Sequence, residues 1–237
     1  MTPPSVERRS AAPQTNASPY NPVVARLEQE AIELLREHDQ YWASVNSVIW
    51  QVEYRLLNHC EKLARMMERL GVEQGLDREA LALRHSAGLL HDIGKANPAC
   101  VYYRLRLSFT PEQRAELSRD HSDLSGKYVV ERLAEVRPED HEFIRTLYVP
   151  VRFHHRPHLI RDPVLRAIGF ELKYADSFLS FQEDRERPGL GLSEALEALE
   201  MVAEQDKQKP DFVPFAGDID RVVSLLRQIY GLSTPPA

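Results

Sequence analysis

The sequence predicts an all-α protein whose helices pack together as a bundle. Apolar residues recur at intervals of three and four over most of the chain, as they do on one face of a helix. Capping residues followed by proline mark helix starts, and no useful stretch alternates between apolar and polar residues as a half-buried strand would. With 237 residues and 43% hydrophobic composition, the chain can bury one or two ordinary cores.

We expect three parts along the chain. Residues 1–22 are rich in Pro, Ser, Ala and Asn, a composition typical of a disordered tail. Residues 23–45 form a predicted N-terminal helical extension, which we expect to pack on its own domain rather than to mediate dimerisation. Residues 46–232 carry the remaining helices and form one domain without an internal repeat.

Caps and apolar faces define the individual helices. The expected N-caps are Asp77, Thr110, Asp162 and Ser193. Thr110 is the clearest, because Pro111 follows at the first helical position and Gln113 completes a capping box. The apolar residues expected to turn inward are Leu27, Ala31, Leu34 and Leu35; Val52, Leu56, Leu63, Met66, Met67 and Leu70; Leu83, Ala87 and Leu90; Leu165, Ile168, Leu172 and Leu179; and Val222, Leu225, Leu226 and Ile229.

Composition narrows the class of protein. The net charge is −6 and charged residues make up 28% of the chain, with no basic stripe that would grip a polymeric nucleic acid. A small phosphorylated molecule is a better candidate ligand. Cys60 and Cys100 are too few for a disulfide scaffold, and no apolar run approaches the roughly 20 residues of a membrane helix. We therefore expect a cytoplasmic protein that does not enter a membrane.

Polar residues occupy positions on two apolar faces. His59 falls on the apolar stripe of its helix, three residues after Leu56. Asp176 falls on the stripe of a later helix, four residues after Leu172. A carboxylate that faces a core costs several kcal/mol unless it is paired or bound to a metal. These positions indicate a polar site inside the bundle.

Further histidines and an aspartate extend this set. His91 and Asp92 directly follow the apolar run at 87–90, which brings both to the inner end of a buried helix. A single histidine on an apolar face is more often hydrogen-bonded in the core than a metal ligand. Imidazole and carboxylate groups on several helices instead form metal sites in bundle cores. The predicted metal ligands are His59, His91, Asp92, His121, His154, His155 and Asp176.

Such a ligand set suits hydrolysis of a phosphate ester. One bridging carboxylate can hold two divalent cations about 3.5–4 Å apart, with histidines completing each coordination sphere. Fe, Mn and Zn all accept these ligands. A water between the two cations loses its proton near neutral pH, and the resulting hydroxide can attack phosphorus in line. Lys95 would place an ammonium near a phosphate oxygen, and Gly94 would let the backbone turn there.

The pattern resembles the HD superfamily of metal-dependent phosphohydrolases, through His-Asp-Ile-Gly-Lys at 91–95, one upstream histidine, and a downstream His, His-His and Asp. Within the superfamily it resembles the HD-GYP group, which hydrolyses the bacterial messenger cyclic di-GMP. Residues 107–117, leading into His121 and Gly126, are similar to that group's segment between its second and third metal motifs. The resemblance covers about residues 46–230.

The resemblance implies a catalytic HD-domain bundle with a binuclear centre in its core. One metal would bind His59, His91 and Asp176, and the other would bind His121, His154 and His155. Asp92 would bridge the two metals, and Lys95 would contact the scissile phosphate.

The chain departs from the group at two places. No Gly-Tyr-Pro tripeptide follows His155, and Arg55 stands where members with a third metal have a Glu, so two metals are expected. Arg55, Arg156 and Arg161 are candidates for binding substrate phosphates, and an ordinary surface position is the alternative for each.

Three functions follow as hypotheses. The first is a phosphodiesterase that hydrolyses a cyclic dinucleotide, cyclic di-GMP, through a metal-bridging hydroxide. The second is a phosphohydrolase acting on another small nucleotide, such as a mononucleotide, a cyclic mononucleotide or an alarmone. The third is a degenerate HD domain that binds a nucleotide or a signalling protein without turnover, which the missing Gly-Tyr-Pro loop keeps open.

Overall fold

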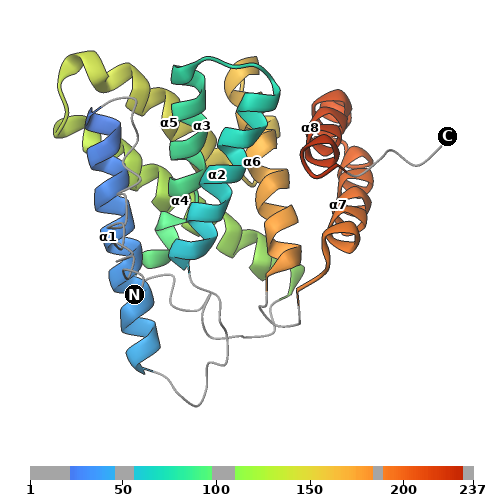
Figure 1. Cartoon of the computed structure of the whole chain (residues 1–237), viewed down its shortest axis with the longest axis horizontal. Coiled ribbons are helices and arrows are strands. Elements are labelled where there is room, and N and C mark those ends of the chain that lie inside the picture. The colour runs from blue at the N-terminus through green and yellow to red at the C-terminus, as the bar shows by residue number, and fades with distance from the viewer. Residues whose placement is uncertain (1–21, 46–55, 98–109, 184–188, 232–237) are drawn as a thin grey trace, which may run out of the picture.

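The computed structural model describes residues 22–45, 56–97, 110–183 and 189–231. Every regular element in these ranges is a helix, which confirms the prediction of an all-α bundle (Figure 1). The α-helices are α1 (Pro22–Val45), α2 (Leu56–Glu73), α3 (Arg78–Leu90), α4 (Pro111–Glu131), α5 (His141–Phe153), α6 (Pro163–Gln182), α7 (Leu192–Lys207) and α8 (Ala216–Ile229). Short 3₁₀ turns are η1 (Ile93–Ala96), η3 (Arg132–Ala134), η4 (Pro138–Asp140), η5 (Pro157–Leu159) and η6 (Val213–Phe215). Residues 1–21 of the expected tail at 1–22 lie outside the described residues, as do Val52, Arg55 and Cys100, whereas Pro22 is the first residue of α1.

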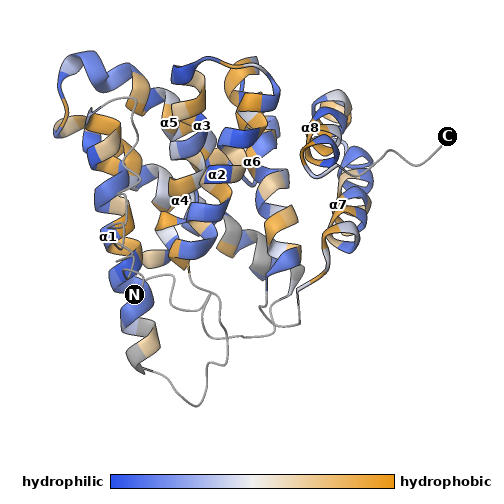
Figure 2. Ribbon diagram, viewed as in Figure 1, coloured by the Kyte–Doolittle hydropathy of each residue, from blue (hydrophilic) through white to orange (hydrophobic). Residues whose placement is uncertain are grey.

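Helices α2 to α6 form the centre of the bundle. Figure 1 shows α1 along one edge of this group and the pair α7 and α8 along the other. α1 contacts α2 and α3, whereas α6 contacts α2 and α5 on one side and α7 and α8 on the other. The ribbon of most helices carries both hydrophobic and hydrophilic stretches in Figure 2, as expected when one side of each helix is buried.

Three of the four expected N-caps are confirmed. The side chain of Asp77 accepts a hydrogen bond from the backbone N–H of Ala80 at the start of α3. Thr110 and Gln113 form the capping box of α4, and Asp162 caps α6. These caps satisfy backbone donors that a helix start otherwise leaves unpaired.

The prediction for Ser193 is wrong. α7 begins at Leu192, and its N-cap is Gly191. Glu194 takes the capping role, because its carboxylate accepts a hydrogen bond from the Gly191 N–H at 3.0 Å. Ser193 therefore lies within the first turn.

The hydrophobic core includes nearly all of the described apolar residues that were predicted to face inward. Leu27, Ala31 and Leu35 of α1 belong to the same core cluster as the later helices. Leu34 is the exception, because 37% of it is exposed on the outer side of α1. Leu165 and Leu225 are only partly buried.

The centre of α2 packs very closely against α3 at Gly88. A Cβ atom on Gly88 would lie 2.7 Å from the Cα of Ala64 and 2.8 Å from its backbone nitrogen. Only a residue without a side chain allows this approach. The approach matters for the site because α2 carries His59 and α3 leads into His91.

A buried ion network ties the far ends of these helices to α6 and α8. Glu171 is fully buried and accepts hydrogen bonds from Arg84 at 2.8 Å, from Arg221 at 3.0 Å and from Gln74 at 3.0 Å. A buried carboxylate with this many charged and polar donors is compensated for its lost hydration.

α1 also caps the helix that carries His59. The carboxylate of Asp39 accepts hydrogen bonds from the backbone N–H groups of Leu56 at 3.1 Å and Leu57 at 3.0 Å. These two groups open α2, so a residue 17 positions earlier serves as its N-terminal cap. The N-terminal helix thus helps to define where α2 begins.

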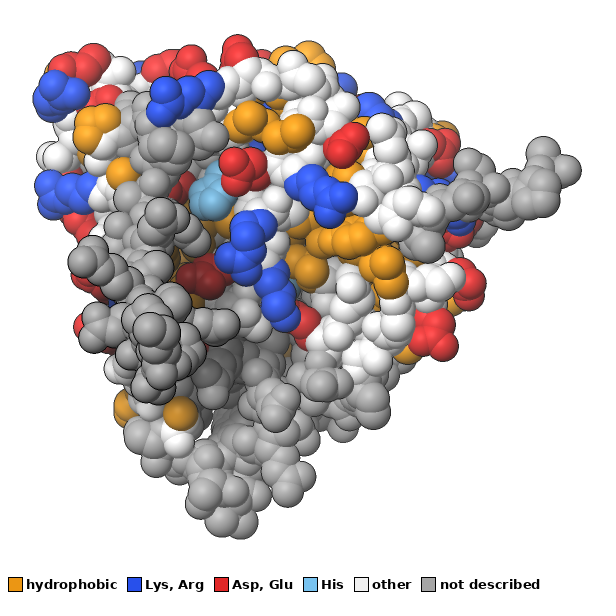
Figure 3. Space-filling model, viewed as in Figure 1, with side chains coloured by type: hydrophobic (Ala, Val, Ile, Leu, Met, Phe, Trp, Pro, Cys, Tyr) orange, Lys and Arg blue, Asp and Glu red, His pale blue; other side chains and the backbone are white. Residues whose placement is uncertain are grey.

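Charged side chains of both signs are found on one face of the molecule. On the face in Figure 3, Lys and Arg side chains lie among Asp and Glu side chains. Among the helices of the described ranges, none combines the length and apolar character needed to cross a membrane.

We predict that Asp39→Ala lowers the stability of the fold by about 1 kcal/mol, the usual effect of removing an N-cap. For a chain of this size, the melting temperature should fall by about 2–4 °C. Thermal unfolding followed by circular dichroism measures the change. Asp39→Asn keeps an acceptor for the N–H groups and should retain most of the stability. Equal melting temperatures for the Ala variant and the wild type would show that this cap contributes nothing.

Candidate metal centre

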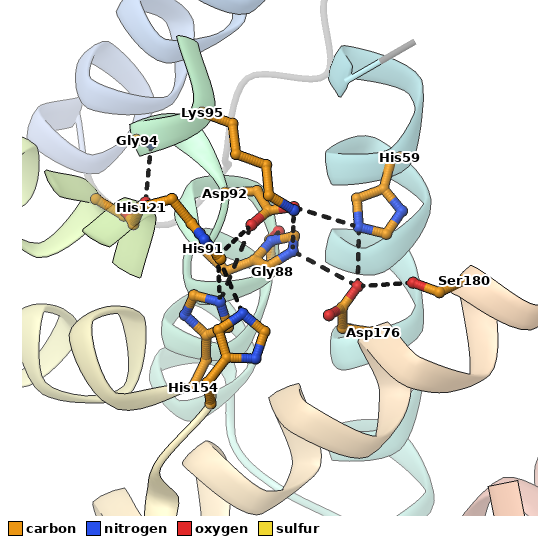
Figure 4. Close-up of polar contacts among 12 residues, drawn as sticks. His59, Gly88, His91, Asp92, Gly94, Lys95, His121, His154, Asp176 and Ser180 are labelled. Atoms are coloured by element: carbon orange, nitrogen blue, oxygen red, sulfur yellow. Dashed lines mark hydrogen bonds and ion pairs between the residues drawn. The ribbon is translucent and has the colours of Figure 1, made fainter. Parts of the chain in front are cut away.

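The seven predicted metal ligands come together at the middle of the bundle (Figure 4). His59 lies on α2, His91 is the C-cap of α3, and Asp92 immediately follows it. His121 lies on α4, His154 and His155 follow α5, and Asp176 lies on α6. Five helices therefore supply the side chains, and the fold rather than the local sequence brings them together.

Six of the seven side chains form two groups. The first, which we call the His/Asp group, consists of His59, His91 and Asp176. The second, the three-histidine group, consists of His121, His154 and His155. Within each group the ligand atoms lie within 4.8 Å of one another, close enough to bind one ion.

Asp92 lies between the two groups and turns one oxygen toward each. Its Oδ2 is 3.3 Å from Nε2 of His91 and 3.8 Å from Nε2 of His59. Its Oδ1 is 3.1 Å from Nε2 of His121 and 3.9 Å from Nε2 of His154. The carboxylate is almost completely buried, at 1% exposure. This arrangement allows a single carboxylate to bridge two cations.

Backbone carbonyls orient three of the imidazole rings. Nδ1 of His91 lies 2.9 Å from the Gly88 carbonyl, and Nδ1 of His121 lies 3.0 Å from the Leu117 carbonyl. Nδ1 of His154 lies 2.7 Å from the carbonyl of Val151. A carbonyl oxygen only accepts, so Nδ1 carries the hydrogen in each ring. Each Nε2 therefore presents a lone pair to the centre.

The side chains at the His/Asp group are held by carboxylates. Nε2 of His59 is 3.0 Å from Oδ1 of Asp176, and Nδ1 is 3.0 Å from a carboxylate oxygen of Glu183. Burial lowers the pKa of His59, but the hydrogen bonds to Asp176 and Glu183 outweigh it and leave this pKa above its usual value. Burial opposes ionisation of Asp176, yet its hydrogen bond with His59 holds the pKa of Asp176 well below the ordinary range.

Glu183 was not among the predicted site residues. It is the C-cap of α6, seven residues after Asp176, and its contact with His59 joins segments 124 positions apart, which no local pattern reveals.

In the three-histidine group the pKa values of the imidazoles are lowered, whereas that of His59 is raised. Burial, followed by the nearby charges of His91 and His121, lowers the pKa of His154 to about 3. Burial also lowers the pKa of His121 and of His155. These imidazoles are neutral at physiological pH, which is the protonation state that binds a metal ion.

The pKa of Asp92 is held well below its usual range. Burial opposes this shift, but the nearby charges of His91 and Lys95 outweigh it. Nζ of Lys95 donates to Oδ2 of Asp92 at 2.5 Å. Asp92 is therefore an ionised carboxylate in the bundle core, available as a metal ligand.

The residues fit divalent cations. In the described part of the chain, Nε2 of His91 and Oδ1 of Asp92 are buried and make no hydrogen bond. A buried polar atom without a partner costs about 1–3 kcal/mol. Since Nδ1 of His121 carries its hydrogen, the Nε2 lone pair also faces the lone pairs of Asp92, and only a cation or a proton between them relieves the repulsion. Imidazole nitrogens with carboxylate oxygens suit Fe, Mn and Zn.

Gly94 has a different role from the one expected. A turn in the backbone does not require it, since the described glycines with positive φ are Gly75 and Gly231. A Cβ on Gly94 would instead lie 2.1 Å from the carbonyl oxygen of His121 and 2.7 Å from the backbone nitrogen of Ser125. Its own N–H donates to Ser125 Oγ at 2.8 Å. Gly94 therefore lets η1 pack directly against α4, which brings Asp92 next to His121.

The two arginines expected to bind phosphate follow the three-histidine group. Arg156 is half-buried, and its Nη2 lies 3.4 Å from Oδ1 of Asp123. Arg161 is exposed. The ring of His158 packs on Phe212, with 4.6 Å between ring centroids, so His158 belongs to neither ligand group. The phosphate-binding roles of Arg156 and Arg161 remain predictions.

Comparisons with known proteins give no match. No family model matches the chain, and no curated protein or solved structure is significantly similar to it. The likeness to the HD superfamily is therefore carried by the motif residues alone.

We predict that Gly94→Ala weakens both the fold and metal binding. The added methyl group would push η1 away from α4, and such overpacking costs about 1–3 kcal/mol. Thermal unfolding and metal analysis of the purified protein measure the two effects. Gly217→Ala is the matched control, because a Cβ at Gly217 meets no atom within 4 Å. Normal stability and metal content in Gly94→Ala would contradict the steric role.

We predict that Mn²⁺ stabilises the chelator-treated protein. Binding only to the folded state contributes about 2.7 kcal/mol at a free concentration 100 times the dissociation constant. The melting temperature should then rise by about 5–10 °C, and excess chelator should reverse the rise. His85→Ala should show the same rise, since His85 pairs with Glu68 outside both ligand groups. Asp92→Ala should lose most of it. A wild-type melting temperature that Mn²⁺ does not change would count against a metal centre.

Proposed function

We propose that the chain is an HD-type metal-dependent phosphodiesterase that hydrolyses a cyclic dinucleotide, cyclic di-GMP. The observation that carries the proposal is the position of Asp92, a buried carboxylate with one oxygen toward the His/Asp group and the other toward the three-histidine group. An ordinary structural ion pair does not require two separate sets of imidazole nitrogens around one carboxylate. A binuclear hydrolytic centre does.

The side chains of the two groups and of Asp92 would hold the cations that the reaction needs. Asp92 would hold both cations, with the His/Asp group completing one coordination sphere and the three-histidine group the other. Two divalent cations at this place would acidify a water molecule and neutralise charge on the phosphate. The neutral imidazoles of the three-histidine group and the low pKa of Asp92 mean that protons need not be removed from these four ligands first.

Lys95 is suited to bind the phosphate. Its ammonium now compensates Oδ2 of Asp92, the same oxygen that would bind a cation. The side chain is partly exposed, at 16%, and has a flexible stem. With Oδ2 of Asp92 occupied in holding a cation, the ammonium of Lys95 would be repelled from this oxygen and would turn toward a phosphate oxygen. Lys95 therefore couples filling of the metal site to binding of the substrate.

A cyclic dinucleotide has two phosphodiester groups, and the chain offers cations for both. One phosphate would bind at the metal centre, beside the ammonium of Lys95. Arg156 or Arg161 would bind the second, since a guanidinium group binds phosphate through two parallel hydrogen bonds. The resemblance of residues 107–117 and 121–126 to the HD-GYP group supports the same class of substrate.

A second candidate, hydrolysis of a mononucleotide, a cyclic mononucleotide or an alarmone, is favoured by the segment after His155. This segment consists of the single turn η5 before α6 begins at Pro163. It packs tightly on α6, because a Cβ on Gly169 would lie 2.8 Å from Cδ1 of Ile160. A short, tightly packed connection leaves less chain to surround a large substrate.

A substrate panel tests the proposal. The full chain is purified with Mn²⁺ or Fe²⁺, its bound metal is counted, and it is offered cyclic di-GMP beside mononucleotides, cyclic mononucleotides and alarmones. We expect two metal ions per chain and conversion of cyclic di-GMP to a linear dinucleotide by addition of one water. Asp92→Ala should abolish turnover, and His85→Ala, which removes a histidine outside the centre, should retain it.

The other outcomes select among the alternatives. Hydrolysis of mononucleotides or alarmones alone would replace the first candidate with the second. Tight nucleotide binding without any product, whichever metal is present, would indicate a binding domain, for which a signalling protein is the expected partner. A metal content near zero in folded protein would refute the phosphohydrolase proposal altogether.

A further inference from the structure

We propose that Glu183 is a positioning residue that makes the His/Asp group the tighter of the two metal sites. The inference rests on the proposed metal centre and deepens it, because it assigns a different role to each half. Glu183 does not belong to either ligand group, and no motif in the sequence points to it.

The contact of His59 differs in kind from those of the other rings. His91, His121 and His154 turn Nδ1 toward backbone carbonyls of their own helices. Nδ1 of His59 instead lies 3.1 Å from Oε1 and 3.0 Å from Oε2 of Glu183, a residue 124 positions away. A side-chain carboxylate thus orients the ring of His59, whereas main-chain carbonyls orient the other three rings.

α6 holds both nitrogens of the His59 ring. Asp176 contacts Nε2, and Glu183 contacts Nδ1. The backbone N–H of Glu183 donates to the Leu179 carbonyl at 3.1 Å, so the last turn of α6 fixes Glu183 relative to Asp176. The ring of His59 is fully buried and the carboxylate of Glu183 is only 9% exposed. The position of the ring is therefore defined by α6 as much as by its own helix.

A carboxylate behind a ligating imidazole changes the ligand itself. It fixes the tautomer that leaves Nε2 free to bind, and it raises the basicity of that nitrogen. Loss of such a partner typically weakens metal binding about 10–100-fold.

Charge makes the two halves unequal. The His/Asp group contains Asp176 and has Glu183 behind it, so two full negative charges lie beside this half. The three-histidine group contains no carboxylate, so its own ligands bring no negative charge. Asp92 gives one oxygen to each half, and the single positive charge of Lys95 at Oδ2 offsets only part of the negative charge of Asp176 and Glu183. Attraction between charges is strong in a buried site, and we therefore expect the first dication to bind at the His/Asp group.

Titration with Mn²⁺ tests the inference. Chelator-treated wild type, Glu183→Gln and Glu183→Ala are titrated in competition with a fluorescent chelator. We expect two binding events in the wild type. The tighter event should weaken about 10-fold in Glu183→Gln, which keeps an acceptor but no charge, and by up to about 100-fold in Glu183→Ala. The weaker event should change much less.

Glu68→Gln provides the matched control. Glu68 lies on α2 and contacts Nδ1 of His85 at 3.2 Å, so the substitution removes the same kind of Glu–His pair outside the metal centre. Its Mn²⁺ affinities should equal those of the wild type. Visible absorption of Co²⁺-substituted protein gives a second readout. Glu183→Ala should change the spectrum of the first ion bound, a change that a purely structural role would not cause.

The outcomes separate this inference from the proposed function. Two wild-type events with the tighter one unchanged in Glu183→Gln and Glu183→Ala would overturn the role of Glu183 and leave the phosphodiesterase proposal standing. Weakening of both events to the same extent would overturn the unequal halves. Absence of Mn²⁺ binding to the wild type would overturn both proposals.

Discussion

The burial of one carboxylate, that of Asp92, is the constraint on which the rest of the site depends. An ionised group loses most of its hydration in a bundle core, and it is stable there only with compensating charges or ligands. Lys95 provides one such charge, and the surrounding imidazoles provide nitrogen atoms that could bind cations. Five helices must end or pass at this point to supply them. The architecture of the centre of the bundle follows from that requirement.

Close backbone packing makes the arrangement precise. Gly88 lets α3 approach α2, and Gly94 lets η1 approach α4. Both contacts leave no room for a methyl group, so the ligands on these elements are held at distances that side-chain packing alone would not define. The buried network around Glu171 ties α3, α6 and α8 together, which adds rigidity to the same helices. Metal centres need such rigid support, because small displacements of the ligands reduce affinity.

Helical periodicity was sufficient to predict the fold class and two residues of the centre, and the other ligands were predicted from the combination of several histidines with the pair His91-Asp92. His59 and Asp176 stood out because they are polar residues on apolar faces. The roles of Glu183 and Asp39 could not be predicted, because each depends on a contact between segments far apart in the sequence. Ser193 was mistaken for a cap because Gly191 lacks a side chain and the compensating carboxylate of Glu194 lies further along. Gly94 was expected to let the backbone turn, whereas its observed role, close contact with α4, appears only in three dimensions.

The source of the Nδ1 contacts affects how the site responds to mutation. His91, His121 and His154 are oriented by main-chain carbonyls, which every residue type possesses, so substitutions at Gly88, Leu117 or Val151 would not remove an acceptor. His59 depends on a side chain that a single nucleotide change could replace. Genetic drift can therefore alter the orientation of His59, while main-chain acceptors protect the orientation of His91, His121 and His154. In the proposed metal centre, His59 is therefore the ring whose orientation is most exposed to mutation.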